Sequence, residues 1–325
     1  MNILVTGGAG YIGSHVVKLL GESGEHSITI LDNLSTGRKE AILYGKLVEM
    51  DLGEYDKVEQ LFQSNHFDAV IHFAAFIVVP ESVEKPIKYY KNNTINTTHL
   101  IDTASRNAVK YFVFSSTAAV YGEPDVSVVD ELLPLMPINP YGWSKLMSEQ
   151  VLRDTCFATG MKHVILRYFN VAGADPDGKI GQNFPGATHL IKVASQTALG
   201  MRKEIAIFGT DFDTPDGTGV RDYIHVTDLA SAHLAALSFL DKNGSSQTLN
   251  CGYGRGFSVR EVLKEVEKVH GRPFAIVETE RRAGDPASLI ADNTKILKTL
   301  DWTPQYDDLT TICKTAYEWE KNLTK

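Results

Sequence analysis

The first half of the chain alternates short apolar runs with helix-length amphipathic segments. We expect the apolar runs to be strands, at residues 2–6, 27–31, 46–50, 69–73, 111–115 and 163–167. Several of these runs are apolar almost throughout, which is typical of parallel strands that are covered on both faces. The alternation therefore predicts an α/β fold built on a doubly wound parallel sheet.

The first predicted strand runs into a glycine-rich turn, TGGAGYIG, with Gly8, Gly10 and Gly13 in the pattern G-x-G-x-x-G. Such glycines allow a tight turn and bring backbone N–H groups to a pyrophosphate at the start of the next helix. Asp32 ends the second strand, 19 residues beyond Gly13. A carboxylate there accepts hydrogen bonds from an adenosine ribose and repels a 2′-phosphate, so the pattern favours NAD over NADP. The alternative is a tight turn with a capping aspartate.

The alternation stops after about residue 170. Segments 172–188 and 211–220 are rich in Gly, Pro and Asp and are expected to be long ordered loops, which are commonly functional. Helices are expected at 259–270 and 309–322.

These patterns predict a Rossmann-type domain followed by a smaller, interleaved C-terminal lobe that binds the substrate. The predicted domain covers 1–170 with returning elements at about 222–252, and the predicted lobe covers about 171–221 and 253–325.

Composition narrows the class of partner and the compartment. The formal net charge of −8 argues against nucleic acid or an anionic membrane as the main partner. Cys156, Cys251 and Cys313 are far apart, which suggests a reducing compartment and neither a disulfide framework nor a zinc site. The longest apolar runs are too short to span a bilayer, and no cationic leader precedes the first strand. A cytoplasmic protein is expected.

Tyr141 and Lys145 are four residues apart in YGWSK, so they share one face if the segment is helical. Asn139 and Pro140 before them suit a helix start. A free tyrosine has a pKa of about 10, and lowering it by about three units needs roughly 4 kcal/mol. A lysine cation and a positive nicotinamide ring both favour the phenolate. On its own, the pair is more typical of a structural Tyr–Lys contact on a helix surface, where such i,i+4 pairs are common.

The fifth predicted strand leads into hydroxyl side chains, Ser115, Ser116 and Thr117. The carboxyl ends of strands border the active-site crevice of a doubly wound sheet. We therefore expect Thr117 to hydrogen-bond a substrate hydroxyl and to relay its proton to Tyr141. The alternative is a Ser/Thr turn that caps the strand.

The glycine-rich turn, Asp32, the hydroxyl strand end and Tyr-x-x-x-Lys resemble the extended short-chain dehydrogenase/reductase family. The phrases SSTAAVYG, YGWSK, RYFN-VAGA and GTGVRDYIHV resemble its UDP-galactose 4-epimerase branch along nearly the whole chain. The resemblance implies reversible C4 epimerisation of UDP-galactose and UDP-glucose through a transient 4-keto intermediate, with tightly bound NAD and with Thr117, Tyr141 and Lys145 as catalytic residues. It also implies a homodimer, formed through a helix bundle that includes residues 92–105.

Alternatives remain open at this point. The same chemistry serves UDP-N-acetylhexosamines and UDP-glucuronate, and Leu289 stands where some relatives carry a bulky tyrosine beside the sugar. Ala118 and Ala119 replace the acid that dehydratases and decarboxylases of the family carry, which disfavours elimination. A non-catalytic sensor of NAD or nucleotide sugars shares the fold and is a rival from another class.

The resemblance extends the set of predicted contacts. Asp51 and Leu52 follow the third strand and are expected near the adenine, and Phe73 to Ala75 follow the fourth. The predicted cofactor residues are Gly7, Gly10, Tyr11, Ile12, Gly13, Asp32, Asn33, Asp51, Leu52, Phe73, Ala74, Ala75, Asn92, Ser115, Tyr141, Lys145 and Tyr168.

The predicted substrate residues follow from the same resemblance. Arg221 and Arg282 carry forked donors suited to a diphosphate, although a solvated charge is the alternative for each. Asn170 is assigned to the diphosphate, Asp285 to the uridine ribose, and residues 206–208 to the uracil. The complete set is Thr117, Tyr141, Asn170, His189, Leu190, Ala206, Ile207, Phe208, Arg221, Tyr223, Arg282 and Asp285. No metal site is predicted, because the spacing of the histidines does not suit metal ligation.

Overall fold

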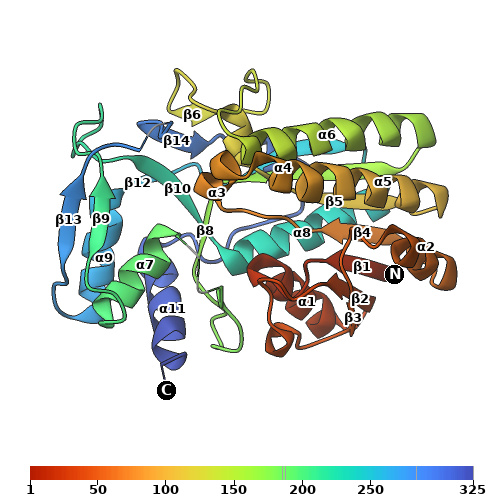
Figure 1. Cartoon of the computed structure of the whole chain (residues 1–325), viewed down its shortest axis with the longest axis horizontal. Coiled ribbons are helices and arrows are strands. Elements are labelled where there is room, and N and C mark those ends of the chain that lie inside the picture. The colour runs from red at the N-terminus through yellow and green to blue at the C-terminus, as the bar shows by residue number, and fades with distance from the viewer. Residues whose placement is uncertain (185, 187, 283, 325) are drawn as a thin grey trace.

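The computed structural model describes residues 1–184, 186, 188–282 and 284–324, and within them a seven-stranded sheet dominates the larger part of the molecule (Figure 1). All neighbouring strands in this sheet are parallel. Their order is β11 (Gln247–Cys251), β7 (Lys162–Tyr168), β5 (Tyr111–Thr117), β4 (Ala69–His72), β1 (Asn2–Thr6), β2 (Ser27–Asp32) and β3 (Lys46–Glu49). The predicted strands are present, and their ends differ from the predicted ends by no more than two residues. The predicted doubly wound sheet is confirmed.

Helices cover both faces of this sheet. On one face lie α1 (Tyr11–Ser23) and α8 (Val226–Asp241), and on the other lie α2 (Tyr55–Ser64), α5 (Asn96–Arg106) and α6 (Pro140–Thr159) (Figure 1). Alternate strand residues enter two different apolar cores: Ile3 and Val5 face α1, whereas Leu4 faces the α5 side. Burial on both faces is the physical reason for the nearly continuous apolar runs.

The chain reverses its winding direction between β1 and β4. Strands β1, β2 and β3 proceed toward one edge, and β4, β5, β7 and β11 proceed toward the other. Ligands of doubly wound sheets bind at the carboxyl ends of the strands where the winding direction changes, and in this sheet those strands are β1 and β4.

A second, smaller part of the molecule carries two further sheets. One has five strands, β6 (Val128–Val129), β8 (Asn170–Ala172), β10 (Val220–His225), β12 (Gly256–Ser258) and β14 (Ser288–Ala291); the other pairs β9 (Ile205–Phe208) with β13 (Ile276–Thr279). Its helices are α7 (Leu190–Ala198), α9 (Val259–His270) and α11 (Leu309–Asn322), whereas α10 (Thr294–Thr299) contacts β11 of the main sheet. The helices predicted at 259–270 and 309–322 are confirmed at both ends.

The chain passes between the two parts more than once. After β10 in the five-stranded sheet, α8 and β11 return to the main sheet, and β12 goes back. Strand β10 belongs to the smaller sheet, although most of it lies in the segment 222–252 that is predicted for the larger domain. The division into a domain at 1–170 with 222–252 and a lobe at 171–221 with 253–325 therefore stays a proposal.

Short helical segments complete the fold. They are η1 (Lys39–Ala41), α3 (Val79–Glu84), α4 (Pro86–Tyr89), the π-helix η2 (Tyr90–Ile95) and η3 (Ala118–Tyr121). In the described part of the chain, no helix is both long and apolar enough to cross a bilayer.

The start of α6 is confirmed as the sequence predicts it. Asn139 caps the helix by accepting a hydrogen bond from the backbone N–H of Gly142 at 2.9 Å, and Pro140 occupies the first turn. The helix ends at Gly160, whose φ of 81° suits glycine. These two ends fix where Tyr141 and Lys145 lie along the helix.

Candidate active site

The glycine-rich turn between β1 and α1 packs against the loop after β4. Gly7 has a φ of 71°, and a Cβ on it would lie 2.6 Å from the backbone N of Ala74. A Cβ on Gly13 would lie 2.2 Å from the carbonyl oxygen of Gly7. Both contacts exclude a side chain, so the structure brings together two of the segments predicted to bind the cofactor.

The N-terminus of α1 has the form of a phosphate site. Gly10 is its N-cap, and among the residues that the structure describes no side chain caps this end. The backbone N–H groups of the first turn, near Tyr11 and Ile12, therefore remain available at the positive end of the helix dipole. The turn fits the pyrophosphate of a dinucleotide.

Asp32 is buried at the end of β2. Its Oδ2 accepts from the backbone N–H of Ala9 at 2.9 Å, and its Oδ1 accepts from that of Leu34 at 2.8 Å. Burial raises the pKa of this carboxyl, and the two hydrogen bonds oppose the shift. A carboxylate has about four acceptor positions, so Asp32 can fix the turn and still accept from a ribose.

The predicted adenine-side residues also lie close together. Asn33 Nδ2 donates to Asp51 Oδ2 at 2.5 Å, and Leu52 beside Asp51 is buried. The residues that follow β2 and β3 therefore lie side by side at the same edge of the sheet, next to Asp32.

Three predicted catalytic residues meet at the end of β5. The Thr117 side chain hydrogen-bonds the phenol of Tyr141, and Lys145 Nζ donates to the carbonyl oxygen of Ser115 at 2.8 Å. The Lys145 amine also lies 5.0 Å from the centre of the Phe114 ring. Tyr141 and Lys145 are 9% and 3% exposed, so this part of the site is largely dry.

The electrostatics of this trio differ from the sequence-based expectation. Burial lowers the pKa of Lys145 to about 7, and the Glu149 carboxylate opposes this shift. Burial raises the pKa of Tyr141, and the hydrogen bond with Thr117 opposes that shift. Lys145 directs its amine at Ser115 rather than at the phenol. The protein alone therefore holds Tyr141 as a neutral phenol, and forming the phenolate requires a further positive charge nearby.

Tyr168 joins the same edge from β7. It lies opposite Thr117 in the strand register, and its hydroxyl hydrogen-bonds Ser115 Oγ. Tyr168 and Phe73 both have rings beside His233, at 6.2 and 4.8 Å between centres. The structure thus brings together three of the residues predicted to bind the cofactor, Ser115, Tyr168 and Phe73.

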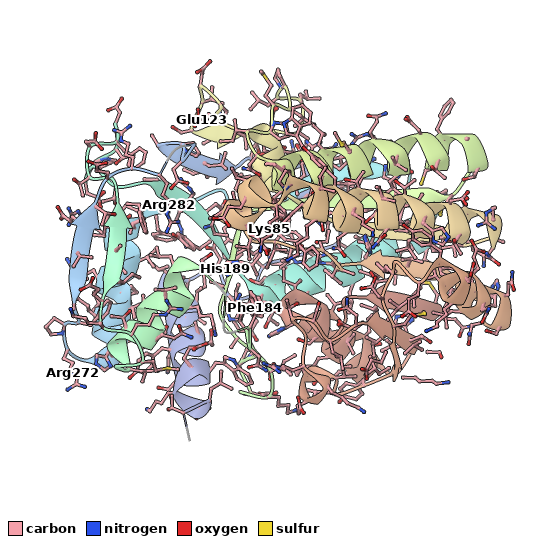
Figure 2. All side chains as sticks on the ribbon, in the orientation of Figure 1. Lys85, Glu123, Phe184, His189, Arg272 and Arg282 are labelled. Carbon is pink, nitrogen blue, oxygen red and sulfur yellow. The ribbon has the colours of Figure 1, made fainter. Side chains whose placement is uncertain are left out.

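The predicted nucleotide residues form a second group in the smaller lobe. Arg221 Nη2 lies 3.7 Å from Asp285 Oδ1, and the Arg282 guanidinium lies 3.6 Å from the centre of the Phe208 ring. Figure 2 shows Arg282 toward the middle of the molecule and Arg272 at its outer edge. The structure therefore places the predicted diphosphate ligand Arg282 on the predicted uracil platform.

The predicted uracil segment has two different faces. Ala206 and Phe208 project to one side of β9, whereas Ile207 is 1% exposed in the core on the other side. Ile207 can therefore offer only backbone groups to a base.

The remaining predicted substrate residues lie on neighbouring elements. Asn170 on β8 is opposite Tyr223 on β10 in the strand register. His189 is the N-cap residue of α7, immediately before Leu190, and its Nδ1 hydrogen-bonds Gln182 Nε2 at 3.0 Å. Burial lowers the pKa of His189. His189 therefore belongs with Gln182 in the loop before α7 rather than with Arg282 and Phe208. Figure 2 shows His189 and Arg282 both toward the middle of the molecule.

Residues 3–252 match the NAD dependent epimerase/dehydratase family. This chain belongs to that family. The UDP-glucose 4-epimerase of Azospirillum brasilense is 54% identical over 322 residues, which cover 99% of this chain and 92% of that protein. The resemblance stated from the motifs is thereby confirmed.

Solved structures agree with this assignment. The UDP-Glc/GlcNAc 4-epimerase from Campylobacter jejuni is 54% identical, with a TM-score of 0.87 and 99% of each chain covered. The UDP-glucose 4-epimerase from Brucella ovis, solved in complex with NAD, is 43% identical, with a TM-score of 0.94, and the match covers 98% of this chain and 97% of that one.

The structure also shows supporting residues that the sequence reasoning missed. Asn93 lies in the π-helix η2, next to the predicted cofactor residue Asn92, and is 1% exposed. Its Oδ1 accepts from the backbone N–H of Phe76 at 2.8 Å, and its Nδ2 donates to Ser144 Oγ at 3.1 Å. This amide ties the loop after β4 to the helix that carries Tyr141. A single asparagine in a polar run gives no sequence signal, whereas π-helices often mark functional sites.

A buried ion pair joins α6, the helix that carries Tyr141 and Lys145, to β7. Arg167 donates to both oxygens of Glu149, at 3.0 and 2.7 Å, and Ser116 Oγ donates to Glu149 Oε1 at 2.5 Å. Glu149 is 0% and Arg167 2% exposed. The pair fixes α6 against β7. Glu149 stands four residues after Lys145 and so shares its helix face. A second charged residue on that face was the available sequence signal.

Proposed function

We propose that this protein is an NAD-dependent UDP-glucose 4-epimerase that interconverts UDP-galactose and UDP-glucose in galactose metabolism. The observation that carries the proposal is the buried group of Thr117, Tyr141 and Lys145 at the end of β5. The high identity to named 4-epimerases over nearly the full chain supports the same reaction.

The cofactor residues are proposed from the fit of the turn. Gly7, Gly10 and Gly13 with the N-terminus of α1 would hold the pyrophosphate, and Asp32 would hold the adenosine ribose. Ser115, Tyr168 and Phe73 would surround the nicotinamide. NAD, when bound there, supplies the hydride acceptor and donor for C4 of the sugar and a positive ring near Tyr141.

Tyr141 acts as the acid and base of the reaction. Its phenolate takes the proton of the C4 hydroxyl, and Thr117 aligns the two oxygens through its hydrogen bond to the phenol. Ala118 and Ala119 beside Thr117 offer no group that moves a proton at C5 or C6. The 4-keto sugar is therefore reduced again rather than dehydrated, and Tyr141 returns the proton to the C4 oxygen.

The nucleotide supplies most of the binding energy. The 4-keto sugar must turn over within the site without leaving, so its own contacts have to be weak. Arg221, Arg282 and Asn170 are proposed to hold the diphosphate, with Asp285 on the uridine ribose and Phe208 against the uracil. A base on the observed face of Phe208 would displace the Arg282 guanidinium, which frees it for the diphosphate.

The first experiment incubates the purified protein with UDP-galactose and no added cofactor, and follows the sugar by NMR. We expect UDP-glucose to appear up to a fixed ratio. Tyr141→Phe should lower turnover by about 10²- to 10⁴-fold, because the general acid–base group is removed, while NAD stays bound. Near-normal turnover of this variant would exclude Tyr141 as the base. Unchanged UDP-galactose with the natural protein, even with added NAD, would contradict the proposed function.

Epimerisation of UDP-N-acetylhexosamines is a second candidate function. Leu289 lies opposite Arg221 in the register of β14 and β10, and it packs against the apolar cluster of Phe169 and Tyr121. A leucine there leaves more room than an aromatic ring. The Campylobacter jejuni relative is described as a UDP-Glc/GlcNAc 4-epimerase.

We further propose a cytoplasmic homodimer formed through α5 and α6. Phe157 and Met147 on α6, Ile87 on α4 and Ile95 on η2 are exposed, Phe157 at 95% and Ile87 at 75%, and α6 contacts both α4 and η2. Exposed apolar side chains on neighbouring elements are typical of an interface. Light scattering should give twice the chain mass, and Phe157→Glu should give monomers; a monomeric natural protein would refute the dimer.

A further inference from the structure

The motif GTGVRDYIHV contains one acid, Asp222, that the proposed mechanism does not use. Asp222 lies on β10 between Arg221 and Tyr223 and is 0% exposed. Its Oδ1 accepts from the backbone N–H of Tyr253 at 3.0 Å. Its Oδ2 accepts from the backbone N–H groups of Gly254 at 2.9 Å and Ala291 at 3.3 Å.

These donors make Asp222 a junction between separate segments. A buried carboxylate is stable only when its acceptor positions are filled. Here backbone groups fill them, two from the turn after β11 and one from the end of β14. The packing is close, because a Cβ on Gly252 would lie 2.6 Å from Asp222 Oδ2. Burial raises the pKa of Asp222 to about 6, so the group is ionised at neutral pH and accepts on both oxygens.

The segments that Asp222 joins carry the two sides of the site. Strand β10 carries Arg221, and β14 places Leu289 opposite it. Strand β11 ends with Cys251 beside Tyr168 of β7, at the edge where the catalytic residues lie. Asp222 therefore connects the nucleotide side to the catalytic edge of the main sheet.

We propose that Asp222 is a positioning residue for the UDP-sugar. Its carboxylate fixes the turn at 252–254 and the end of β14 against β10, and so sets where Arg221 stands relative to the catalytic edge. The inference rests on the proposed function for the identity of the ligand, because Arg221 is assigned to the diphosphate there.

Asp228 provides a matched control. It is 1% exposed on α8 and accepts from the backbone N–H groups of Gln305 at 2.9 Å and Tyr306 at 2.8 Å. It also accepts from the Tyr253 hydroxyl at 2.6 Å. Asp228 thus fastens the segment before α11 and the side chain of Tyr253, and in the described part of the chain no hydrogen bond joins its carboxylate to β14. Replacing it removes a similar number of hydrogen bonds but keeps the bond between Asp222 and Ala291 of β14, the strand beside Arg221.

The test compares Asp222→Asn with Asp228→Asn in the holoenzyme. For each variant, KM and kcat for UDP-galactose, the affinity for UDP by calorimetry, the NAD content and the melting temperature are measured. For Asp222→Asn we expect KM to rise and UDP affinity to fall about tenfold, with kcat within about threefold. For Asp228→Asn we expect a comparable fall in melting temperature and a KM within about twofold of the natural protein.

Gly252→Ala keeps the inference testable if Asp222→Asn does not fold. The added methyl group would displace the Asp222 carboxylate without removing its charge. KM should therefore rise, as it does in Asp222→Asn, but by a smaller factor. Equal KM changes in the Asp222 and Asp228 variants, or a fall in kcat alone, would reduce Asp222 to a purely structural role. If the natural protein binds UDP but does not epimerise UDP-galactose, the proposed function fails, and the UDP affinities still decide the role of Asp222.

Discussion

The catalytic side of the candidate site is buried on regular elements, whereas its nucleotide side is partly exposed on strand ends and loops. Tyr141 and Lys145 project from α6 and are almost fully buried. Phe208 is 36% exposed, and the Arg282 side chain lies over its ring. Proton transfer needs a fixed and dry geometry, but a nucleotide must be able to enter and leave.

The ion pairs beside the two sides differ in the same way. Arg167 and Glu149 support the catalytic helix and are buried, while Arg281 and Asp211 support the nucleotide loop with side chains 44% and 75% exposed. A buried pair is costly to break, and an exposed pair contributes little. The stronger support therefore lies beside the catalytic residues, where the geometry has to be fixed.

The largest effect is expected at Lys145. Lys145→Met should lower kcat by about 10³-fold, because the site loses the amine that holds Ser115 at the end of β5, one helical turn from Tyr141. It should not lower the melting temperature at pH 6, because burying the charged amine costs stability. Loss of stability together with activity would show that Lys145 is needed for folding.

The same variant gives a pH test. Burial lowers the pKa of Lys145 to about 7 from its ordinary value of 10.5. Below pH 7 the amine is charged in both the folded and the unfolded protein, so its full burial cost is present. As pH rises from 7 toward 10.5, the folded form is neutral and the cost shrinks. The gain in melting temperature of Lys145→Met should therefore be greatest below pH 7 and disappear at high pH, and a gain that grows with pH would contradict this.

The next largest effect compares the two ion pairs. Arg167→Met should reduce the free energy of unfolding by about 3–5 kcal/mol, because Glu149 is left buried without its main partner. Arg281→Met should cost less than about 1 kcal/mol. Denaturant unfolding measures both values, and equal costs would remove the distinction between the two sides.

A smaller effect is expected at the nucleotide side. Arg282→Met should raise KM for UDP-galactose by roughly 10- to 100-fold, because charge-assisted hydrogen bonds to the diphosphate are lost, and should leave kcat nearly unchanged. Arg272→Met is the matched control at the outer edge and should leave KM unchanged. A fall in kcat with normal KM would place Arg282 on the catalytic side instead.

The smallest effect concerns the sugar pocket. Leu289→Tyr should lower kcat/KM for UDP-N-acetylglucosamine by about tenfold relative to UDP-galactose, since a larger side chain excludes the acetamido group. Competition between the two substrates in one mixture measures the ratio directly. An unchanged ratio would show that Leu289 does not border the C2 substituent.

The strands, the glycine-rich turn and the helix that carries Tyr141 and Lys145 could be predicted because their signals are local. Apolar runs identify buried parallel strands, and positions such as Gly7 admit no side chain. Asn139 and Pro140 mark the start of α6 within a few residues of the catalytic pair. These features depend on backbone geometry and short-range periodicity, which the sequence carries by itself.

Only the tertiary structure decided which distant residues pair with one another, which are buried and which carry a charge. The amine of Lys145 turns to Ser115 instead of Tyr141, Arg167 finds Glu149, and Asp222 joins two segments that lie far along the chain. Ile207 lies in the core although both of its neighbours do not. Such outcomes depend on which surfaces the folded elements bring together and on how much water they exclude. The sequence therefore determined the chemical groups of the site, and packing decided their partners and their charge.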